Sequence, residues 1–423
     1  MSGDEICELT IGAPAHGGAC VARDDSGRVV FVRHTLPGER VRARIIDQQK
    51  RMAWAEAVEI LEASDERIDS VWPAAGPGGV GGGELSHVSP QGQLRWKSQV
   101  LNEQLGRIGR QQVSEQVEAI GGVEVQAAPG DEGATDLLGR RTRIECVIDR
   151  SGHLGMRRYR SHEIQSLSSM PLASSDISAL PVWDGHEFFE RLHEGARVRL
   201  IAPPGSPALI CTDDGCWDAQ GRPWKRPVTW RLPSLEGVDE YQVRPKGFWQ
   251  THCRGAEVLA RNVEEIAKAC GPSRVMELYS GAGLFSLPLS RVVGPQGVLV
   301  SLEGDEAAVA DATQNVEFGA FDAFVGDVDG QAVHQLNDYV GGAELIVADP
   351  PRSGAGLKVC QAMAQTRADH IVLVSCDPAA AARDLHDLCE LGYSITEMKA
   401  WDLFPYTHHF EVMTVLERNS NSR

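Results

Sequence analysis

Two short segments in the last part of the chain combine residue types that could bind a nucleotide-like ligand. In the first, an apolar run ends in the turn Tyr279-Ser280-Gly281-Ala282-Gly283. Glycines in such a turn let a ligand approach the backbone closely. The next apolar run ends at Glu303, about 20 residues on, where an acidic side chain accepts hydrogen bonds from ribose hydroxyls in dinucleotide folds. A Glu303 that only caps the helix expected near Asp305 would also fit the pattern.

The second segment is Asp349-Pro350-Pro351-Arg352, which follows the buried run 344–349. A carboxylate ends this run, and the two prolines behind it fix the backbone and offer no N–H donor. Such a rigid turn at the mouth of a sheet indicates a binding segment.

Cys376 ends the apolar run 370–375 and stands just before a helix-compatible segment that begins near Pro378. A helix N-terminus favours a thiolate, so the position suits a nucleophile. Most buried cysteines only pack, but the neighbours of Cys376 are polar.

Glu411 opens a terminal strand, and alternation alone does not decide whether it faces solvent or the site. His408 and His409 lie close to it in the sequence, but no third clustered ligand accompanies them, so we predict no metal site.

The elements that must position these residues alternate between strand and helix from about residue 254 onward. The apolar runs are 274–279, 297–303, 344–349 and 370–375, and the helix-length segments are 255–269, 305–316, 355–366 and 378–390. This order predicts an α/β domain with a parallel sheet, helices on both faces, and ligands at the carboxyl ends of the strands.

The N-terminal part of the chain has a different pattern. Short alternating runs punctuated by glycine over 6–62 predict a five-stranded barrel, which carries a basic group of residues: Arg33, His34, Arg40, Arg42, Arg44, Lys50 and Arg51. A solvated strand face and an RNA-binding face both fit this group. Glycines over 76–83 predict a flexible linker without a core of its own, and a helix follows from about Leu94 to Arg110.

The strongest basic patch lies at 137–160 and indicates a hairpin that turns near Ser151-Gly152 with an arginine-rich face. Its arginines include Arg141, Arg143, Arg157 and Arg158. The whole chain of 423 residues is nevertheless acidic, with a net charge of −18, which argues against nucleic-acid binding over the entire surface. We therefore expect an acidic body with one basic channel.

The ten cysteines are scattered and form no Cys-x-x-Cys pair, so we predict that most of them are buried, reduced thiols and that they form no disulfide framework. No run of eighteen apolar residues and no signal-peptide pattern is present, and we expect a cytoplasmic, monomeric protein that does not bind membranes.

Together these segments resemble the RNA 5-methyluridine (uracil-C5) methyltransferase family. Four motifs stand in the order of that family: Phe248-Trp249-Gln250, the glycine turn, Asp349-Pro350-Pro351-Arg352, and Ser375-Cys376-Asp377-Pro378 with the later Phe404-Pro405 and His409-Phe410-Glu411. The resemblance covers nearly the whole chain. It implies a TRAM-type, OB-like β-barrel at 1–64, a glycine-rich linker at 65–93, a central α+β RNA-facing domain at 94–245, and a Rossmann-like class I methyltransferase domain at 246–423.

The resemblance also implies a set of roles. Cys376 would be the nucleophile and Glu411 the proton acceptor, with tRNA or rRNA as the substrate. The S-adenosylmethionine contacts would fall on Gln250, Tyr279, Gly281, Glu303, Asp327 and Asp349, and RNA contacts are expected from Arg42, Arg44, Arg141, Arg143, Arg157 and Arg158.

The chain also departs from the family. Some relatives bind an iron–sulfur cluster through four cysteines, and the corresponding positions here hold Trp72, Val80, Gly83 and Met170. No thiolate remains there to bind iron, so we expect no iron–sulfur cluster. Leu284 replaces a usual asparagine and Ser280 a usual cysteine near the glycine turn, changes that could alter cofactor affinity.

Three other functions remain open from the sequence. An RNA 5-methylcytosine methyltransferase would place a second cysteine in the motif held here by Asp349-Pro350-Pro351-Arg352. A non-catalytic RNA-binding protein on the same fold would have no need of both Cys376 and Glu411. An amino-methyltransferase would carry Tyr or Phe in place of Arg352 and no cysteine.

Overall fold

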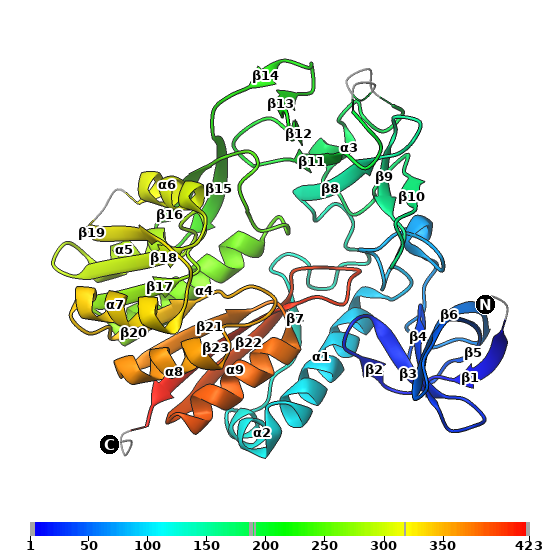
Figure 1. Ribbon diagram of the computed structural model, residues 1–423, viewed down its shortest axis with the longest axis horizontal. Coiled ribbons are helices and arrows are strands. Elements are labelled where there is room, and N and C mark those ends of the chain that lie inside the picture. The colour runs from blue at the N-terminus through cyan, green and yellow to red at the C-terminus, as the bar shows by residue number, and fades with distance from the viewer. Residues whose placement is uncertain (1–4, 186–188, 190–191, 317–318, 420–423) are drawn as a thin grey trace.

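The computed structural model describes residues 5–185, 189, 192–316 and 319–419, and it begins with a small barrel. Its sheet has the order β1-β5-β6-β4-β3-β2 (Figure 1). The predicted barrel is therefore confirmed, with a sixth strand because two residues at 14–15 pair with the start of β3. The strands are β1 (Ile6–Thr10), β2 (Pro14–Ala15), β3 (Ala19–Arg23), β4 (Val29–Arg33), β5 (Arg40–Gln48) and β6 (Met52–Glu62).

The glycine-rich segment after the barrel is packed rather than a flexible linker. It holds the short 3-10 helix η1 (Pro73–Ala75), and Trp72 and Val80 belong to the apolar core of the central domain. The exposed fractions of these two side chains are 2% and 1%. Their burial orders the segment despite its glycines, because a buried indole contributes about 1.5–3 kcal/mol or more of apolar stabilisation.

The central part contains a seven-stranded sheet of order β10-β9-β8-β11-β12-β13-β14. The predicted hairpin is confirmed, since β8 and β9 are antiparallel and Gly152 in the turn has φ +82°. Cys211 and Cys216 form a disulfide between β12 and β13, so these two cysteines are exceptions to the expectation that most of the thiols are reduced. The elements are β8 (Arg143–Ile148), β9 (Leu154–Arg157), β10 (Ile164–Ser166), α3 (Ser175–Ser178), β11 (Arg197–Ile201), β12 (Leu209–Thr212), β13 (Gly215–Asp218) and β14 (Pro223–Trp224).

The C-terminal part is built on an eight-stranded sheet of order β19-β18-β17-β20-β21-β23-β22-β7. The four strands expected from apolar runs are all present, and those four pair in parallel. The strands are β17 (Arg274–Leu278), β18 (Val298–Glu303), β19 (Ala320–Val325), β20 (Leu345–Ala348), β21 (His370–Ser375), β22 (Tyr393–Asp402) and β23 (Glu411–Arg418). Strand β23 runs antiparallel to β21 and β22, so Glu411 begins its strand beside the end of β21, where Cys376 follows.

Helices cover both faces of this sheet, as the alternation predicts (Figure 1). The four expected helices are α4 (Gly255–Cys270), α6 (Glu306–Asn315), α8 (Leu357–Thr366) and α9 (Pro378–Glu390). Two more, α5 (Ser286–Val293) and α7 (Gly330–Val340), were not expected. No helix in the described part of the chain is long and apolar enough to cross a membrane.

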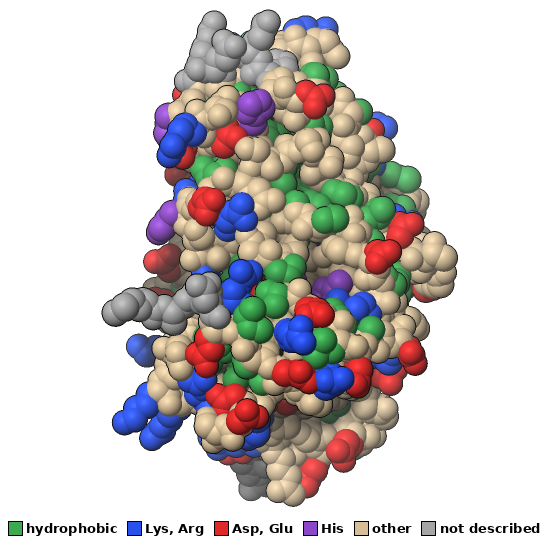
Figure 2. Space-filling view, turned by 90° about the vertical axis from the view of Figure 1, so that its right-hand side faces the viewer, with side chains coloured by type: hydrophobic (Ala, Val, Ile, Leu, Met, Phe, Trp, Pro, Cys, Tyr) green, Lys and Arg blue, Asp and Glu red, His purple; other side chains and the backbone are tan. Residues whose placement is uncertain are grey.

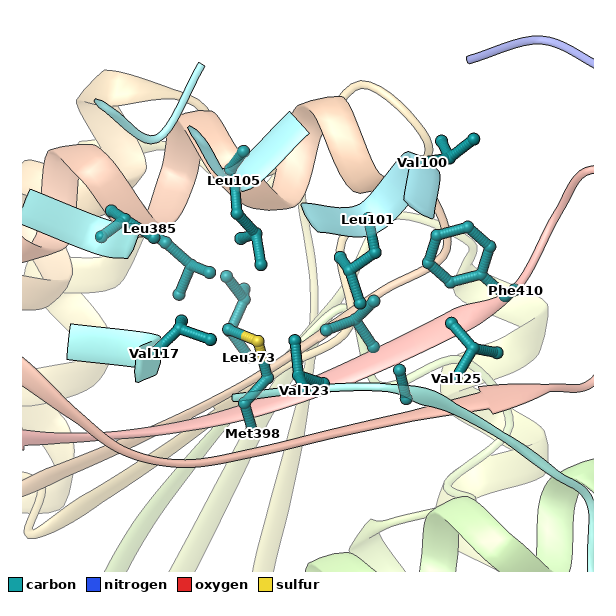
Figure 3. Close-up of a cluster of buried hydrophobic side chains, with 14 of the residues drawn as sticks. Val100, Leu101, Leu105, Val117, Val123, Val125, Leu373, Leu385, Met398 and Phe410 are labelled. Carbon is teal, nitrogen blue, oxygen red and sulfur yellow. The ribbon is translucent and has the colours of Figure 1, made fainter. Parts of the chain in front are cut away.

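The helices α1 (Pro90–Arg107) and α2 (Arg110–Ala119) pack on the C-terminal sheet, although the predicted division at residue 94 would assign them to the central domain. The strand β7 (Val125–Ala127) joins that sheet by pairing in parallel with β22. Figure 3 shows Leu101 and Leu105 of α1 pointing toward Leu385 of α9 and Leu373 of β21. This part of the chain therefore supports the catalytic sheet.

Candidate active site

A cleft of about 700 Å³ opens at the carboxyl ends of the parallel strands. All six expected cofactor residues and both expected catalytic residues line it: Gln250, Tyr279, Gly281, Glu303, Asp327, Asp349, Cys376 and Glu411. Segments separated by up to 160 residues in the sequence thus meet at one place, because consecutive parallel strands end at the same edge of the sheet.

The glycine turn forms one wall of the cleft. Tyr279 and Gly281 both have positive φ, +63° and +52°, and a Cβ at Gly283 would lie 3.1 Å from the Cβ of Ala312. Only glycine fits Gly283 without moving α6. The turn therefore needs its glycine pattern for backbone geometry as well as for ligand approach.

Glu303 holds this wall in place. Its Oε2 accepts a hydrogen bond from the backbone N–H of Gly281 at 3.0 Å, and its Oε1 accepts one from Asp305 at 2.8 Å. Asp305 is itself the N-cap of α6, since its side chain accepts from the N–H of Ala307. Glu303 is therefore not the cap, and its carboxylate keeps lone pairs for a ligand hydroxyl.

Gln250 reaches the cleft from the segment before α4. The preceding Trp249 is buried and stacks on Trp230 with 5.5 Å between ring centroids. Trp230 belongs to the hairpin of β15 (Val228–Ser234) and β16 (Gly237–Val243). Phe248, by contrast, is 70% exposed at the cleft.

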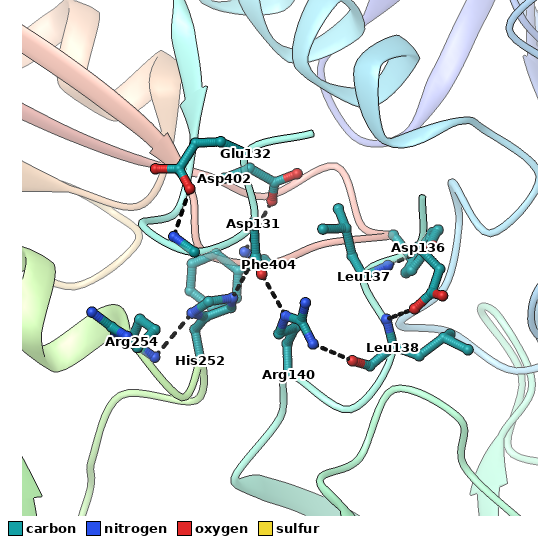
Figure 4. A network of polar contacts seen from close by, with 12 residues as sticks. Asp131, Glu132, Asp136, Leu137, Leu138, Arg140, His252, Arg254, Asp402 and Phe404 are labelled. Atoms are coloured by element: carbon teal, nitrogen blue, oxygen red, sulfur yellow. Dashed lines mark hydrogen bonds and ion pairs between the residues drawn. The ribbon is translucent and has the colours of Figure 1, made fainter. Parts of the chain in front are cut away.

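A polar network fixes the other end of the Gln250 segment (Figure 4). Asp131 accepts a hydrogen bond from Arg140 at 2.5 Å, and its second oxygen lies 3.2 Å from Nε2 of His252. The carbonyl of Thr251 accepts from the backbone N–H of Thr142 at 2.8 Å. Residues 131–142, which precede the C-terminal catalytic part in the sequence, thus help to position Gln250 through Thr251 and His252.

Cys376 is half-buried at the end of β21, and acidic groups surround it. Burial raises the pKa of the Cys376 thiol to about 12, with further contributions from Glu411 and Asp349, while Arg352 acts in the opposite direction. Burial likewise raises the pKa of Asp349 to about 7. Burial, followed by the charge of Asp349, raises the pKa of Glu411 well above its usual range, and Arg352 again opposes the shift.

The loop between β22 and β23 carries Phe404 and His409 into the cleft and leads to Glu411. The buried ammonium of Lys97 on α1 binds Asp402 at 2.6 Å and the carbonyl of Phe404 at 3.2 Å. Gln93, one turn earlier on α1, accepts from the backbone N–H of Tyr406 at 2.5 Å. Helix α1 thus holds the loop that places the predicted base.

The barrel also reaches the site, a contact that no local sequence pattern predicts. His16, in the turn between β2 and β3, lies 3.1 Å from a carboxylate oxygen of Asp377. Asp377 directly follows Cys376 and is the N-cap of α9, accepting from the N–H of Ala380 at 2.8 Å. His408 lies near both Glu84 and His409, with 3.7 Å to a Glu84 oxygen.

The six arginines expected to bind RNA do not form one cluster. Arg44 and Arg157 are exposed, and Arg42 is exposed but paired with Glu59 at 2.7 Å. Arg143 is half-buried, and burial lowers its pKa to about 10. Arg141 donates to the carbonyl of Gly82 at 2.7 Å, and Arg158 donates to Gly78. The last two arginines hold the glycine-rich segment.

The four positions at which the family resemblance places cluster ligands are occupied by closely packed residues. Trp72, Val80 and Met170 are buried in one apolar cluster. A Cβ placed on Gly83 would lie 2.7 Å from the ring of Trp72, so the indole occupies the space beside this glycine.

The sheet order, the glycine turn and the acidic cleft define a Rossmann-like class I methyltransferase. A solved tRNA (uracil-54, C5)-methyltransferase from Pyrococcus abyssi, in complex with S-adenosyl-L-homocysteine, shares this fold. Its TM-score is 0.66 at 20% identity, with 97% of this chain and 99% of that chain covered.

The sequence comparisons are more specific. Residues 332–419 match the tRNA (Uracil-5-)-methyltransferase family model, and residues 4–58 match the TRAM domain. An RNA methyltransferase of Bifidobacterium longum is 35% identical, with 97% of this chain and 96% of its own length covered. A 23S rRNA (uracil(1939)-C(5))-methyltransferase of Halomonas elongata is 31% identical, covering 98% and 90%. The chain belongs to the family of RNA uracil-C5 methyltransferases, which use S-adenosylmethionine.

Proposed function

We propose that the protein forms 5-methyluridine in tRNA or rRNA through a covalent bond between Cys376 and C6 of the target uracil. The meeting of Cys376, Glu411 and the glycine turn in one cleft carries this proposal. The target base must leave its stack to enter the cleft, which costs a few kcal/mol when it is paired and less in a loop.

The cleft residues fit S-adenosylmethionine. Among the described residues, Ser280 Oγ and Glu411 Oε2 are buried without a hydrogen-bond partner, and both residues line the cleft. Glu303, Asp327 and Asp349 would face the cationic, hydroxyl-bearing cofactor with carboxylates, and Gln250 would add an amide. When bound, the cofactor supplies the electrophilic methyl group that C5 accepts.

Cys376 and Glu411 divide the remaining chemistry. Uracil C5 is a poor nucleophile, and addition of the Cys376 sulfur to C6 moves electron density onto C5. After methylation, Glu411 removes the C5 proton, and the electron pair of that bond expels the Cys376 sulfur from C6. Addition requires the thiol to lose its proton, a step that Arg352 favours because it lowers the pKa of Cys376.

We also propose that the protein works without an iron–sulfur cluster. The apolar packing of Trp72, Val80 and Met170 supports this, because none of these side chains offers the thiolate that binds an iron–sulfur cluster. Iron and acid-labile sulfide bound in stoichiometric amounts after anaerobic purification would contradict it.

RNA containing 5-fluorouridine tests the covalent step. In 5-fluorouridine the C5 hydrogen is replaced by fluorine, which a base cannot remove as a proton. The elimination step is therefore blocked, and a denaturation-resistant protein–RNA adduct should accumulate in the presence of S-adenosylmethionine. The Cys376→Ala variant should form none, whereas Cys360→Ala, which changes a fully buried cysteine in the same domain, should behave as wild type. Absence of adduct with wild type, or its persistence in Cys376→Ala, would disprove the mechanism.

The role of Glu411 is tested on unmodified RNA. The Glu411→Gln variant keeps the size of the side chain but cannot accept the C5 proton, so the methylated adduct should persist where wild type releases it. Gel electrophoresis under denaturing conditions measures the trapped fraction. Normal turnover by this variant would show that Glu411 is not the base that removes the C5 proton.

The same assays separate the alternatives. A 5-methylcytosine methyltransferase would form its adduct on 5-fluorocytidine RNA, but the Asp349-Pro350-Pro351-Arg352 segment offers no second cysteine. A non-catalytic RNA-binding protein would form no adduct with either RNA.

A further inference from the structure

The outer face of the barrel carries an aromatic pair that the methylation site does not use. Phe31 on β4 and Trp54 on β6 are neighbours in register, and their rings stack with 5.0 Å between centroids and 25° between planes. Both side chains are half-buried, while the intervening residues of the two strands point into the barrel core. The barrel therefore carries a stacked aromatic pair on its outer face.

The central domain extends this surface. The guanidinium of Arg160 lies 4.4 Å from the ring centroid of Trp54 and 5.4 Å from that of Tyr159. The guanidinium of Arg33 lies over the same Tyr159 ring, 3.4 Å from its centroid. Arg33 also forms an ion pair with Glu56 at 2.8 Å. Rings and guanidinium planes thus alternate across the junction of barrel and hairpin. We call Phe31, Trp54, Tyr159 and Arg160 the aromatic face.

Arg160 covers Trp54 without being fixed there. It is exposed, has φ +51°, and makes no hydrogen bond or ion pair with any described residue. Arg33, by contrast, is buried and held by Glu56. The guanidinium of Arg160 can therefore leave the Trp54 ring for a phosphate at the expense of only its cation–π contacts.

The surroundings of the aromatic face favour a polyanion over a protein partner. Exposed basic side chains on the barrel and the hairpin make no ion pair with any described residue: Arg23, Arg44, Lys50, Arg51 and Arg157. Exposed acidic side chains stand on the barrel too, but those of Glu8, Glu59 and Glu62 are paired with arginines, which leaves Glu5, Asp25 and Asp47. Figure 2, in which the barrel side of the molecule faces the viewer, shows hydrophobic side chains in its lower half with Lys, Arg, Asp and Glu side chains among them. Aromatic rings with interleaved arginines are the means by which proteins bind single-stranded nucleic acid.

We propose that the aromatic face is a second RNA subsite, at which an unpaired nucleobase of the substrate stacks on Trp54 while Arg160 moves to the adjacent phosphate. The inference rests on the proposed function for the identity of the ligand as RNA. It assigns to the barrel a stacking contact that holds a single-stranded part of the substrate outside the methylation cleft.

Three variants test the subsite by their affinity for a fluorescein-labelled, single-stranded oligouridylate, measured by fluorescence anisotropy. Trp54→Leu keeps apolar area but removes the π-face, and should weaken binding about tenfold. Trp54→Phe keeps a stacking ring and should stay within about twofold of wild type. Tyr339→Leu removes an exposed aromatic partner of Phe324 on the catalytic domain and should change nothing.

A crosslink on the wild-type protein checks the same contact without any substitution. Oligouridylate carrying 4-thiouridine should crosslink, under long-wavelength light, to the peptide that contains Trp54. Crosslinks confined to other peptides would overturn the proposal, as would a Trp54→Leu variant that melts like wild type and binds RNA equally well.

The subsite and the proposed function fail in different ways. In Trp54→Leu, adduct formation on 5-fluorouridine RNA should need about tenfold more RNA to reach half of its maximal rate, since the aromatic face holds RNA and does not touch the reacting atoms. An unchanged half-saturating RNA concentration would contradict the subsite. Wild-type protein that binds oligouridylate through Trp54 but forms no adduct would disprove the methylation mechanism and leave the subsite standing.

Discussion

At the scale of single residues, the cleft disfavours the deprotonation of its two catalytic groups, and one opposing positive charge offsets this effect only in part. Cys376 must become a thiolate and Glu411 a carboxylate, yet burial raises the pKa of both, and each added negative charge raises it further. Arg352 acts against both shifts. It belongs to the segment that also supplies Asp349, so one rigid turn brings the acid and the opposing cation to the cleft.

Removal of the Arg352 charge should shift the pH dependence of adduct formation to higher pH. In Arg352→Gln the pKa values of Cys376 and Glu411 rise, so fewer molecules hold the thiolate and carboxylate at neutral pH. We expect the rate of adduct formation on 5-fluorouridine RNA to fall about tenfold or more at pH 7. The rate should recover toward wild type as the pH increases, because a higher pH restores the deprotonated fraction of Cys376.

The pH dependence distinguishes this role from a structural one. Arg352→Lys keeps the positive charge and should retain a rate profile close to that of wild type. A fall in rate by the same factor at every pH in Arg352→Gln would mean that Arg352 only shapes the cleft.

At the scale of elements, the reactive loop depends on a helix far away in the sequence. Lys97 and Asp402 are both almost fully buried, and each would be an uncompensated charge without the other. Their pair fixes the start of the loop that runs through Phe404 and His409 to Glu411. The helix α1 therefore acts on catalysis through the position of this loop.

Loss of the Lys97 charge should destabilise the protein strongly. Lys97→Met leaves the Asp402 carboxylate buried and unpaired, which costs about 3–5 kcal/mol in comparable pairs. The exposed pair of Arg261 and Glu265 is the matched control, and Arg261→Met should cost less than about 1 kcal/mol. Urea unfolding measures both values, and equal values for the two variants would contradict the importance of burial.

The sequence predicts most of this architecture but not its long-range supports. Strong apolar runs identify β17, β18, β20 and β21, and parallel order then brings Tyr279, Glu303, Asp349 and Cys376 to one edge. Strand β19 is half-exposed throughout and has no such run, so its pattern is weak. The contacts of Lys97 with Asp402 and of His16 with Asp377 join residues hundreds of positions apart, and no local periodicity encodes them.

The glycine-rich segment shows a different limit of sequence reasoning. Its glycines suggest flexibility, but its stability comes from Trp72 and Val80, which pack against a domain that follows later in the chain. Composition describes what the backbone can do, whereas tertiary burial decides what it does.

At the scale of the whole molecule, the barrel touches the catalytic domain and the hairpin at two separate places. His16 contacts Asp377 beside the nucleophile, and Trp54 stacks with Arg160 of the central domain. The barrel is thus positioned between the two other parts, and its exposed basic residues lie on a chain with net charge −18. An acidic body repels RNA in general, so favourable binding must come from local basic groups such as Arg44 and Arg157.

Binding of the substrate RNA should therefore depend strongly on salt, and individual arginines should contribute separately. Each phosphate contact to a single strand contributes about −0.7 to the slope of log K against log salt concentration. Arg44→Ala should reduce the magnitude of that slope by about this amount and weaken binding to all sequences similarly. Arg367→Ala changes an exposed arginine at the end of α8 and should leave the slope unchanged, because the acidic body makes no phosphate contact there. A slope that is the same in Arg44→Ala and wild type would mean that Arg44 makes no phosphate contact.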